Sequence, residues 1–377
     1  MSDSKKCILV WLSGWVDSAV SAYLLKEEGY EVSCGFMINY LDEENPESCP
    51  TLADLEEAKK VATYLDLPFF TFDYREEYEK RIVDYIYTEY EKGNTPNPDV
   101  FCNNLVKFDL FLEEALTLWY DAIATGHYAQ IRHIDEGDIL HWKTEQDFSA
   151  QEIYWLSQAQ NDSHYMLLKW VDPSKDQSYF LSRLSSSQLS KAIFPIGNLL
   201  KSEVRKIAEE VGLPNAKRKD SQWLCFIGKV SMKEFLERRF PKNPGNILDT
   251  SGVVIGGHEW AFSYTIGQRK GIEIWGGPAL FVIAKDTRNN TITVGTEIDL
   301  SLYSKTCILT EWVWSIPEEK DTYHAKIRYR QEDQEVRIKK ERENYRVDFR
   351  ESQRAIAPWQ ICVLYEKDMV IGSGIIV

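Results

Sequence analysis

Apolar and polar residues alternate over the first 130 positions in a way that predicts a doubly wound α/β domain. Residues 8–12 are uniformly apolar, as in a parallel strand buried on both faces. Further strands are predicted at 31–38, 68–74 and 121–125, and helices at 16–28, after Thr51, at 75–91 and at 104–118. Alternating strands and helices indicate a parallel sheet covered on both faces, with ligands bound at the carboxyl ends of its strands.

The second half of the chain has a different pattern. Two short helices are predicted at 201–211 and 231–239, and short alternating segments with turn residues follow from about residue 245, as at 290–295 and 325–329. Residues 131–170 have weak periodicity and are interpreted as an inserted excursion. We therefore expect an α/β domain at 1–200, a small central domain at 201–275 and an all-β, barrel-like domain at 276–377.

Composition narrows the class of protein. The 377 residues are 44% hydrophobic and 27% charged, which is typical of a soluble globular protein. No apolar run approaches the ~20 residues of a membrane span, and the N-terminal run is too short for a signal peptide, so we expect a cytoplasmic protein. The seven cysteines are widely spaced without a CxxC pair, which favours reduced thiols and no structural zinc.

The charged residues give two opposing indications about nucleic-acid binding. The formal net charge of −15 argues against nucleic-acid binding by the chain as a whole. Binding depends on local patches, however, and the basic clusters all follow residue 215. They occur at 217–219, 238–239, 269–270 and 326–340.

A polar turn joins the first predicted strand to the first predicted helix. It reads Ser13-Gly14-Trp15-Val16-Asp17-Ser18, and a strand, a tight turn and a helix in succession aim backbone N–H groups at an anion. Asp17 is expected either to cap the helix or to hold Mg²⁺. The order resembles the pyrophosphate loop of the ATP pyrophosphatases, except that this family has glycine in place of Trp15. Tryptophan resists positive φ, and its indole would fill space that phosphates need.

Two cysteines lie in distinctive segments. Cys102 follows Asn97-Pro98-Asp99 in a turn-rich loop just before the helix predicted at 104–118, whose N-terminus can lower the pKa of a thiol, so we expect a thiolate there. Cys225 lies between Leu224 and Phe226, and from this segment alone it is interpreted as a small buried apolar residue.

Taken together, the motifs of nearly the whole chain resemble one family, the tRNA-specific 2-thiouridylases of bacteria and mitochondria. The matching segments are collinear and lie at 13–18, 95–103, Lys107-Phe108, 124–129, 175–181, 194–197, 204–208, 225–228, 264–271 and 328–330. The resemblance implies an ATP pyrophosphatase (HUP-like) domain, a central domain with a persulfide cysteine and a C-terminal β-barrel.

The same resemblance implies a reaction, its partners and its residues. ATP, with Mg²⁺ as counter-ion, would adenylate the C2 oxygen of the wobble uridine of tRNA. Cys225 would carry sulfur as a persulfide from a sulfur-carrier protein or a cysteine desulfurase, Cys102 would be its catalytic partner, and Asp99 would act as acid or base. No resident metal site is implied, and a monomer is expected.

The residues implied to bind ligands fall into two groups. The ATP group comprises Trp11, Leu12, Ser13, Gly14, Trp15, Val16, Asp17, Ser18, Met37 and Gly126. The tRNA group comprises Asn97, Pro98, Asp99, Lys175, Asp176, Gln177, Arg328 and Tyr329.

Eight of the twelve tryptophans stand where the resembled family has glycine. They are Trp11, Trp15, Trp119, Trp170, Trp223, Trp260, Trp275 and Trp359. A single repeated replacement suggests that the source organism reads UGA as glycine. If the tryptophans are real, the alternative is a catalytically dead tRNA-binding protein. A different ATP pyrophosphatase, such as an amidotransferase-type ligase, is disfavoured by the two cysteine motifs and the missing glutaminase domain.

Overall fold

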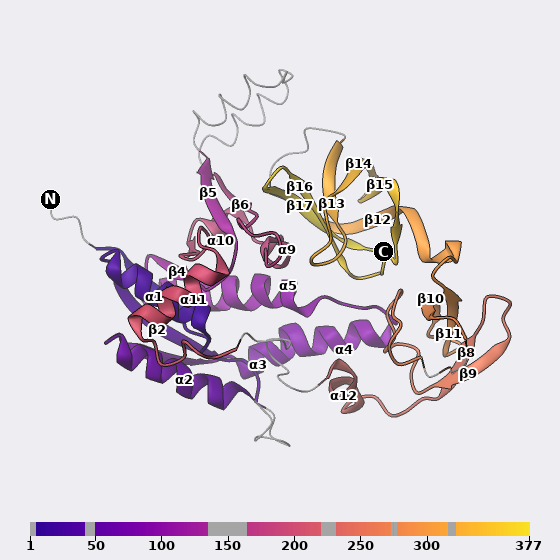
Figure 1. Ribbon diagram of the computed structural model, residues 1–377, viewed down its shortest axis with the longest axis horizontal. Helices are drawn as coiled ribbons and strands as arrows, with labels where there is room; N and C mark the ends of the chain where they lie inside the picture. The colour runs from indigo at the N-terminus through magenta and orange to yellow at the C-terminus, as the bar shows by residue number, and fades with distance from the viewer. Residues whose placement is uncertain are drawn as a thin grey trace.

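The computed structural model describes residues 5–41, 50–134, 164–219, 231–272, 274, 277–315 and 322–377. In chain order it contains a helix-covered parallel sheet, a small four-stranded sheet and a larger closed β-sheet (Figure 1). The helices α4 (Asp84–Glu91) and α5 (Pro98–Cys102) run from the first sheet toward the other two (Figure 1). None of the helices in these described parts combines the length and the apolar character needed to cross a membrane.

Five parallel strands form the first sheet, which confirms the predicted doubly wound α/β class. Their order is β3-β2-β1-β4-β7, so that the chain reverses its direction of winding at β1. The strands are β1 (Cys7–Trp11), β2 (Glu31–Ile38), β3 (Phe69–Asp73), β4 (Ala122–Ala124) and β7 (Ala192–Ile193). Buried residues of β1 alternate between the two faces because successive side chains of a strand point in opposite directions.

Helices cover both faces of this sheet. Ile8 and Val10 pack with α1 (Val16–Glu27), α2 (Pro50–Tyr64) and α11 (Lys201–Val211), so α11 packs with the first domain although residue 201 was expected to begin the central one. Leu9 faces the opposite layer. That layer contains α3 (Arg75–Tyr78), α4 (Asp84–Glu91), α5 (Pro98–Cys102) and α6 (Phe111–Thr117), with π-helical turns at Glu79–Val83 and Asn103–Leu110.

The second part is a sheet with the order β10-β11-β8-β9. Its strands are β8 (Gly245–Leu248), β9 (Val254–His258), β10 (Leu280–Asp286) and β11 (Thr291–Thr296), and α12 (Met232–Glu237) precedes them. Because β8 pairs with β11, this sheet crosses the domain boundary expected between residues 275 and 276.

The third part is the expected C-terminal β-barrel. Its strands are β12 (Tyr303–Trp314), β13 (Thr322–Lys326), β14 (Gln334–Glu341), β15 (Asn344–Arg354), β16 (Ile361–Glu366) and β17 (Met369–Ile376), and pairing of β12 with β17 closes the sheet. A hairpin of β5 (Gln130–Ile134) and β6 (His164–Leu168) extends this sheet from β17. The two ends of the 131–170 segment are therefore paired strands, and residues 135–163 lie outside the described residues. The short helices α9 (Ser178–Leu181) and α10 (Ser186–Leu189) follow this hairpin.

Candidate active site

The turn between β1 and α1 has the geometry of an anion-binding loop. Gly14 has a φ of 80°, and a Cβ at this position would lie 2.3 Å from the Asp54 carbonyl oxygen, so only glycine fits. Trp15 has a φ of −98°, and the expectation of backbone strain at Trp15 is wrong because Gly14 takes the left-handed conformation. The first N–H groups of α1 have no intrahelical acceptor, and no side chain caps them, so they remain suited to an anion.

Two hydroxyl groups reinforce the loop. The Oγ atoms of Ser13 and Ser18 are 3.0 Å apart, and the Ser13 backbone N–H donates to Ser18 Oγ at 3.1 Å. Ser18 Oγ also donates to the carbonyl of Trp15 at 3.1 Å. These bonds hold both ends of the turn together and place both predicted serines within it.

The Trp15 side chain occupies one side of the loop. Its indole Nε1 donates to Asp54 Oδ2 at 3.3 Å, and the Arg218 guanidinium lies 3.7 Å from its ring centre. Arg218 also pairs with Asp54 and donates to the Gly14 carbonyl at 3.0 Å. Burial raises the pKa of Asp54, although its bond to Arg218 opposes that rise. Sequence reasoning noted Arg218 only as part of a basic cluster, and contact with Gly14 makes it a candidate phosphate ligand.

The Asp17 carboxylate accepts hydrogen bonds from residues outside the loop. Its Oδ1 atom accepts hydrogen bonds from the Tyr128 hydroxyl and from Lys201 Nζ, both at 2.6 Å. Of the two roles expected for Asp17, helix capping is not observed. Lys201, at the start of α11, is a second cation that sequence reasoning missed, because a sequence separation of 184 residues from Asp17 hides their contact.

Gly126 explains why the neighbouring strand can approach the loop. A Cβ at Gly126 would lie 2.6 Å from the Ser18 backbone nitrogen and 2.8 Å from the Asp17 carbonyl carbon. Only glycine therefore allows the end of β4 to pack against the start of α1. Leu12 and Met37, also predicted to lie at the ATP site, are buried at the ends of β1 and β2.

The second cluster lies on α5 and the turn after it. Asp99 and Cys102 are three residues apart and therefore on one helix face, and Cys102 is 3% exposed. Burial raises the pKa of the Asp99 carboxyl, while the nearby Lys107 acts in the opposite direction. Lys107 Nζ lies 4.3 Å from the centre of the Trp11 ring, which joins this cluster to the start of the phosphate loop.

The predicted tRNA-contacting residues converge around Tyr179 on α9. The Tyr179 hydroxyl donates to the Ile361 carbonyl at 2.8 Å and shares a hydrogen bond with Asn97. Tyr329 packs against Phe180, with ring centres 4.5 Å apart. Segments near residues 97, 179 and 329 are thus brought together although they are far apart in the chain.

The side chains of the 175–177 segment differ in their surroundings. Asp176 is buried and accepts hydrogen bonds from the Trp170 and Ser178 backbones. Gln177 Oε1 accepts from the Tyr128 backbone at 2.8 Å. Asp176 therefore closes its own turn, Gln177 bonds this turn to the segment after β4, and the predicted contact of both with tRNA stays a prediction.

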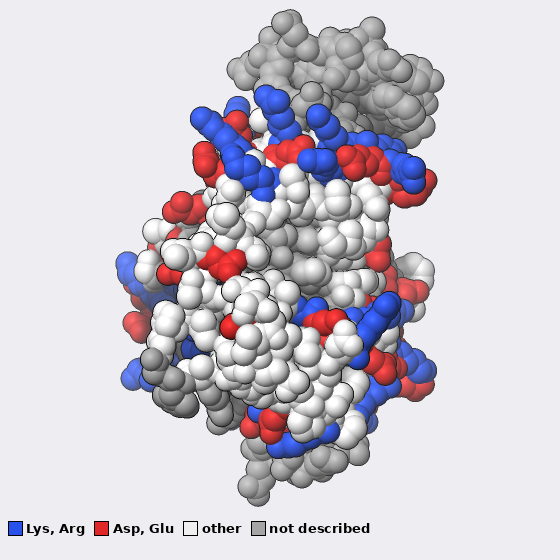
Figure 2. Space-filling view, turned by 90° about the vertical axis from the view of Figure 1, so that its right-hand side faces the viewer, with Lys and Arg blue, Asp and Glu red and all other residues white. Residues whose placement is uncertain are grey.

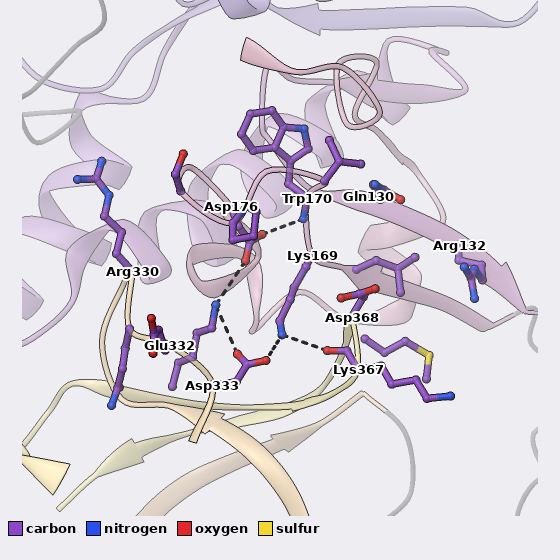
Figure 3. A pocket seen from close by; sticks show the side chains of 17 residues that line it. Gln130, Arg132, Lys169, Trp170, Asp176, Arg330, Glu332, Asp333, Lys367 and Asp368 are labelled. Atoms are coloured by element: carbon purple, nitrogen blue, oxygen red, sulfur yellow. Dashed lines mark hydrogen bonds and ion pairs between the residues drawn. The ribbon is translucent and has the colours of Figure 1, made fainter. Parts of the chain in front are cut away.

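A cavity of about 890 Å³ separates this turn from the barrel. Figure 3 shows Lys169 pointing to Asp333, with Asp176 on the opposite wall and Arg330 at one side. Lys169 Nζ lies 2.5 Å from Asp333 and 3.0 Å from the Lys367 carbonyl oxygen. Two cations of this cavity, Lys169 and Lys326, are therefore paired with carboxylates, those of Asp333 and Asp176.

Basic side chains also gather on the outer surface of the barrel. Arg337, Lys339 and Lys340 are exposed on β14, and Arg350 on β15 pairs with Glu335. Figure 2 shows lysine and arginine interleaved with carboxylates at one end of this face, whose centre is largely uncharged. The basic residues therefore occupy only part of the surface, because the chain as a whole carries a net negative charge.

Three sites predicted from sequence cannot be placed. Cys225, the predicted persulfide carrier, and Trp223 and Trp275 lie outside the described residues. The other predicted residues separate into the phosphate loop with Gly126, the α5 cluster and the group around Tyr179.

Comparison with family models divides the chain into three matched regions. Residues 6–229 match a tRNA methyl transferase HUP domain, residues 233–296 match a tRNA methyl transferase PRC-barrel domain, and residues 304–376 match an aminomethyltransferase beta-barrel domain. Among solved structures, an NMN synthetase from Francisella tularensis aligns with a TM-score of 0.34 and 13% identity, over 63% of this chain and 77% of that one.

Full-length relatives are more similar. The chain is 41% identical to the tRNA-specific 2-thiouridylase MnmA of Staphylococcus epidermidis, over 100% of this chain and 96% of the relative. It is also 41% identical to the proteins of the same name from Shouchella clausii (98% and 96% covered) and Polynucleobacter asymbioticus (100% and 97% covered). With this identity and coverage, and with a phosphate loop and a cysteine-bearing helix at one edge of the sheet, the chain belongs to the tRNA-specific 2-thiouridylase family.

Proposed function

We propose that the chain transfers sulfur to C2 of the wobble uridine of tRNA in an ATP-dependent reaction. Its family membership supports this activity. The observation that carries the proposal is the contact of Lys107 with Trp11, which places the Asp99–Cys102 helix beside the phosphate loop. A loop suited to nucleotide phosphates and a buried thiol therefore share one edge of the sheet.

In the proposed reaction the C2 oxygen of uridine attacks the α-phosphorus of ATP, and pyrophosphate leaves. The Cys102 thiolate then attacks the inner sulfur of a Cys225 persulfide, which forms a Cys102–Cys225 disulfide and releases hydrosulfide. Hydrosulfide displaces AMP from C2 and leaves the thiocarbonyl group. A thiol reductant supplies two electrons to restore both cysteines, and a persulfide-donating protein reloads Cys225.

Different groups of described residues would bind ATP and tRNA. The α1 N-terminus, Ser13 and Ser18 would hold the phosphates, with Arg218 and Lys201 as flanking cations. Mg²⁺ would enter with ATP, and Asp17 is the one carboxylate within the loop. The tRNA would lie against the surface around Tyr179, with its target base turned out toward Asp99.

Thiolation of unmodified tRNA in vitro tests the proposal. Cys102→Ser and Cys225→Ser should each abolish thiouridine formation while pyrophosphate is still released, because adenylation needs neither thiol. Cys307→Ser, in the barrel core, is the matched control and should keep activity. Full thiolation by either of the first two variants would contradict the mechanism.

The same assay addresses a second candidate function. Trp15 stands within the phosphate loop, which favours a tRNA-binding protein without catalytic activity. That function predicts retention of tRNA without ATP-dependent pyrophosphate release from the chain as written.

A further inference from the structure

Lys107 is a buried cation for which the sequence offered no role. Its side chain is 5% exposed, and among the described residues it has neither a hydrogen bond nor an ion pair. Its ammonium lies 4.3 Å from the centre of the Trp11 ring.

An unpaired buried ammonium is unfavourable for folding. Removing such an ion from water costs several kcal/mol, and a desolvated cation–π contact returns about 2 kcal/mol of it. Asp99 lies close enough to interact electrostatically, yet its carboxylate is not within ion-pair distance of Lys107. The fold therefore maintains a positive charge that its described residues do not neutralise.

The position of Lys107 in the fold indicates that its charge serves to bind a ligand. Trp11 ends β1, and His127 follows β4, the strand on the opposite side of β1 from β2. Ligands of doubly wound sheets bind where the strand order reverses, outside the carboxyl ends of the strands. Lys107 contacts Trp11 and acts electrostatically on both His127 and Asp99, so its ammonium lies near the carboxyl ends of β1 and β4.

The neighbouring histidine does not compete for an anion. His127 is buried among Phe108, Phe194 and Trp11, and its Nδ1 is 2.7 Å from the Thr125 hydroxyl. Burial and the Lys107 charge both lower its pKa, so the imidazole is neutral at pH 7. Lys107 is thus the cation of this part of the site.

We propose that Lys107 binds the phosphate that links the nucleotide to the substrate, between the phosphate loop and Asp99. The identity of this anion, the phosphate of AMP, rests on the proposed function. Binding there would place the positive charge of Lys107 where the adenylated intermediate carries its phosphate. Lys107 would therefore bind a different phosphate from the one that Arg218 and Lys201 bind.

The test uses the full-length chain, with AMP and no tRNA. Lys107→Met keeps side-chain length and removes the charge, Lys107→Arg keeps the charge, and Lys206→Met is the control on the exposed face of α11, where Lys206 pairs with Glu210. AMP should raise the Tm of the parent and of Lys206→Met. Lys107→Met should bind AMP about ten- to hundredfold more weakly, as expected for loss of a charge-assisted contact, and Lys107→Arg should retain part of the affinity.

Stability without ligand separates a binding role from a structural one. Removing an unpaired buried charge should leave the Tm of ligand-free Lys107→Met unchanged or higher. A lower Tm, or failure to fold, would show that Lys107 supports the fold and would overturn the proposal. Equal AMP affinity in parent and Lys107→Met, or no AMP binding by the parent, would also overturn it.

Pyrophosphate release with tRNA, measured in parallel, reports on the proposed function separately. If AMP binding depends on Lys107 but no pyrophosphate is released, the anion site stands and the proposed reaction fails.

Discussion

The guanidinium of Arg218 lies 3.7 Å from the centre of the Trp15 ring, on the loop where nucleotide phosphates are expected. The same arginine bonds to Asp54 and to the Gly14 carbonyl. The indole of Trp15 therefore adds to the bonds that hold this cation on the loop. The side chain of residue 15 therefore affects the ability of the loop to bind phosphates more than its backbone conformation does.

Trp15→Gly should strengthen binding of a non-hydrolysable ATP analogue by about tenfold, since it removes the indole from the loop together with a cation–π contact, worth about 1–2 kcal/mol, that helps to hold Arg218. Isothermal titration calorimetry measures this change. Trp312→Phe, in the barrel, is the control and should have no effect on affinity. Identical affinities of the parent and Trp15→Gly for the ATP analogue would show that the indole does not obstruct nucleotide binding.

Trp119 and Trp359 have φ angles of 65° and 67°, in the left-handed region that favours glycine. Trp119 is also 90% exposed, so its side chain contributes little packing. Trp119→Gly should raise the free energy of unfolding by about 1 kcal/mol, measured by urea denaturation. Trp260→Gly should instead lower it by about 3–5 kcal/mol, because Trp260 is buried and its indole donates to the Pro241 carbonyl at 2.7 Å.

These differences bear on the hypothesis that UGA encodes glycine. Of the six described tryptophans at the proposed glycine positions, two have positive φ, whereas Trp170 and Trp260 are buried with bonded indoles. Peptide mass spectrometry of the protein from its native host should find glycine at 119 and 359 if the hypothesis holds. Tryptophan at both positions, or UGG codons there, would refute it.

Burial of Asp99 makes stability depend on pH in a defined direction. Because its folded pKa is raised, the folded state binds more protons than the unfolded state, and Asp99 lowers stability as pH rises from its ordinary pKa through the raised one. Asp99→Asn should therefore be more stable than the parent at pH 7, with a difference that shrinks toward pH 4. A thermal unfolding series across this range measures it, and a difference that grows at low pH would contradict the assignment.

Gly126→Ala should disturb the phosphate loop from the outside. The added methyl group would lie 2.6 Å from the Ser18 nitrogen, so β4 or the start of α1 must move, and we expect a loss of about 1–3 kcal/mol in stability together with weaker ATP binding. Gly277→Ala, where the new methyl group meets no atom within 4 Å, is the control. Unchanged ATP affinity in Gly126→Ala would show that the loop tolerates the shift.

Sequence alone determined the elements and the motifs. The predicted 31–38 strand and 201–211 helix coincide with β2 and α11, because hydrophobic periodicity is a local property. The phosphate loop was also found, since it is a short contiguous segment, whereas Cys102, expected in a loop before the 104–118 helix, lies at the end of α5.

Only the tertiary structure decided what surrounds these segments. It bonded Lys201 to Asp17, set Arg218 on Trp15, placed Lys107 against Trp11, and joined the β5–β6 hairpin to the barrel. It also assigned the left-handed conformation to Gly14 and not to residue 15. These relationships depend on how distant parts of the chain pack together, and such long-range contacts leave no periodic pattern in the order of residues.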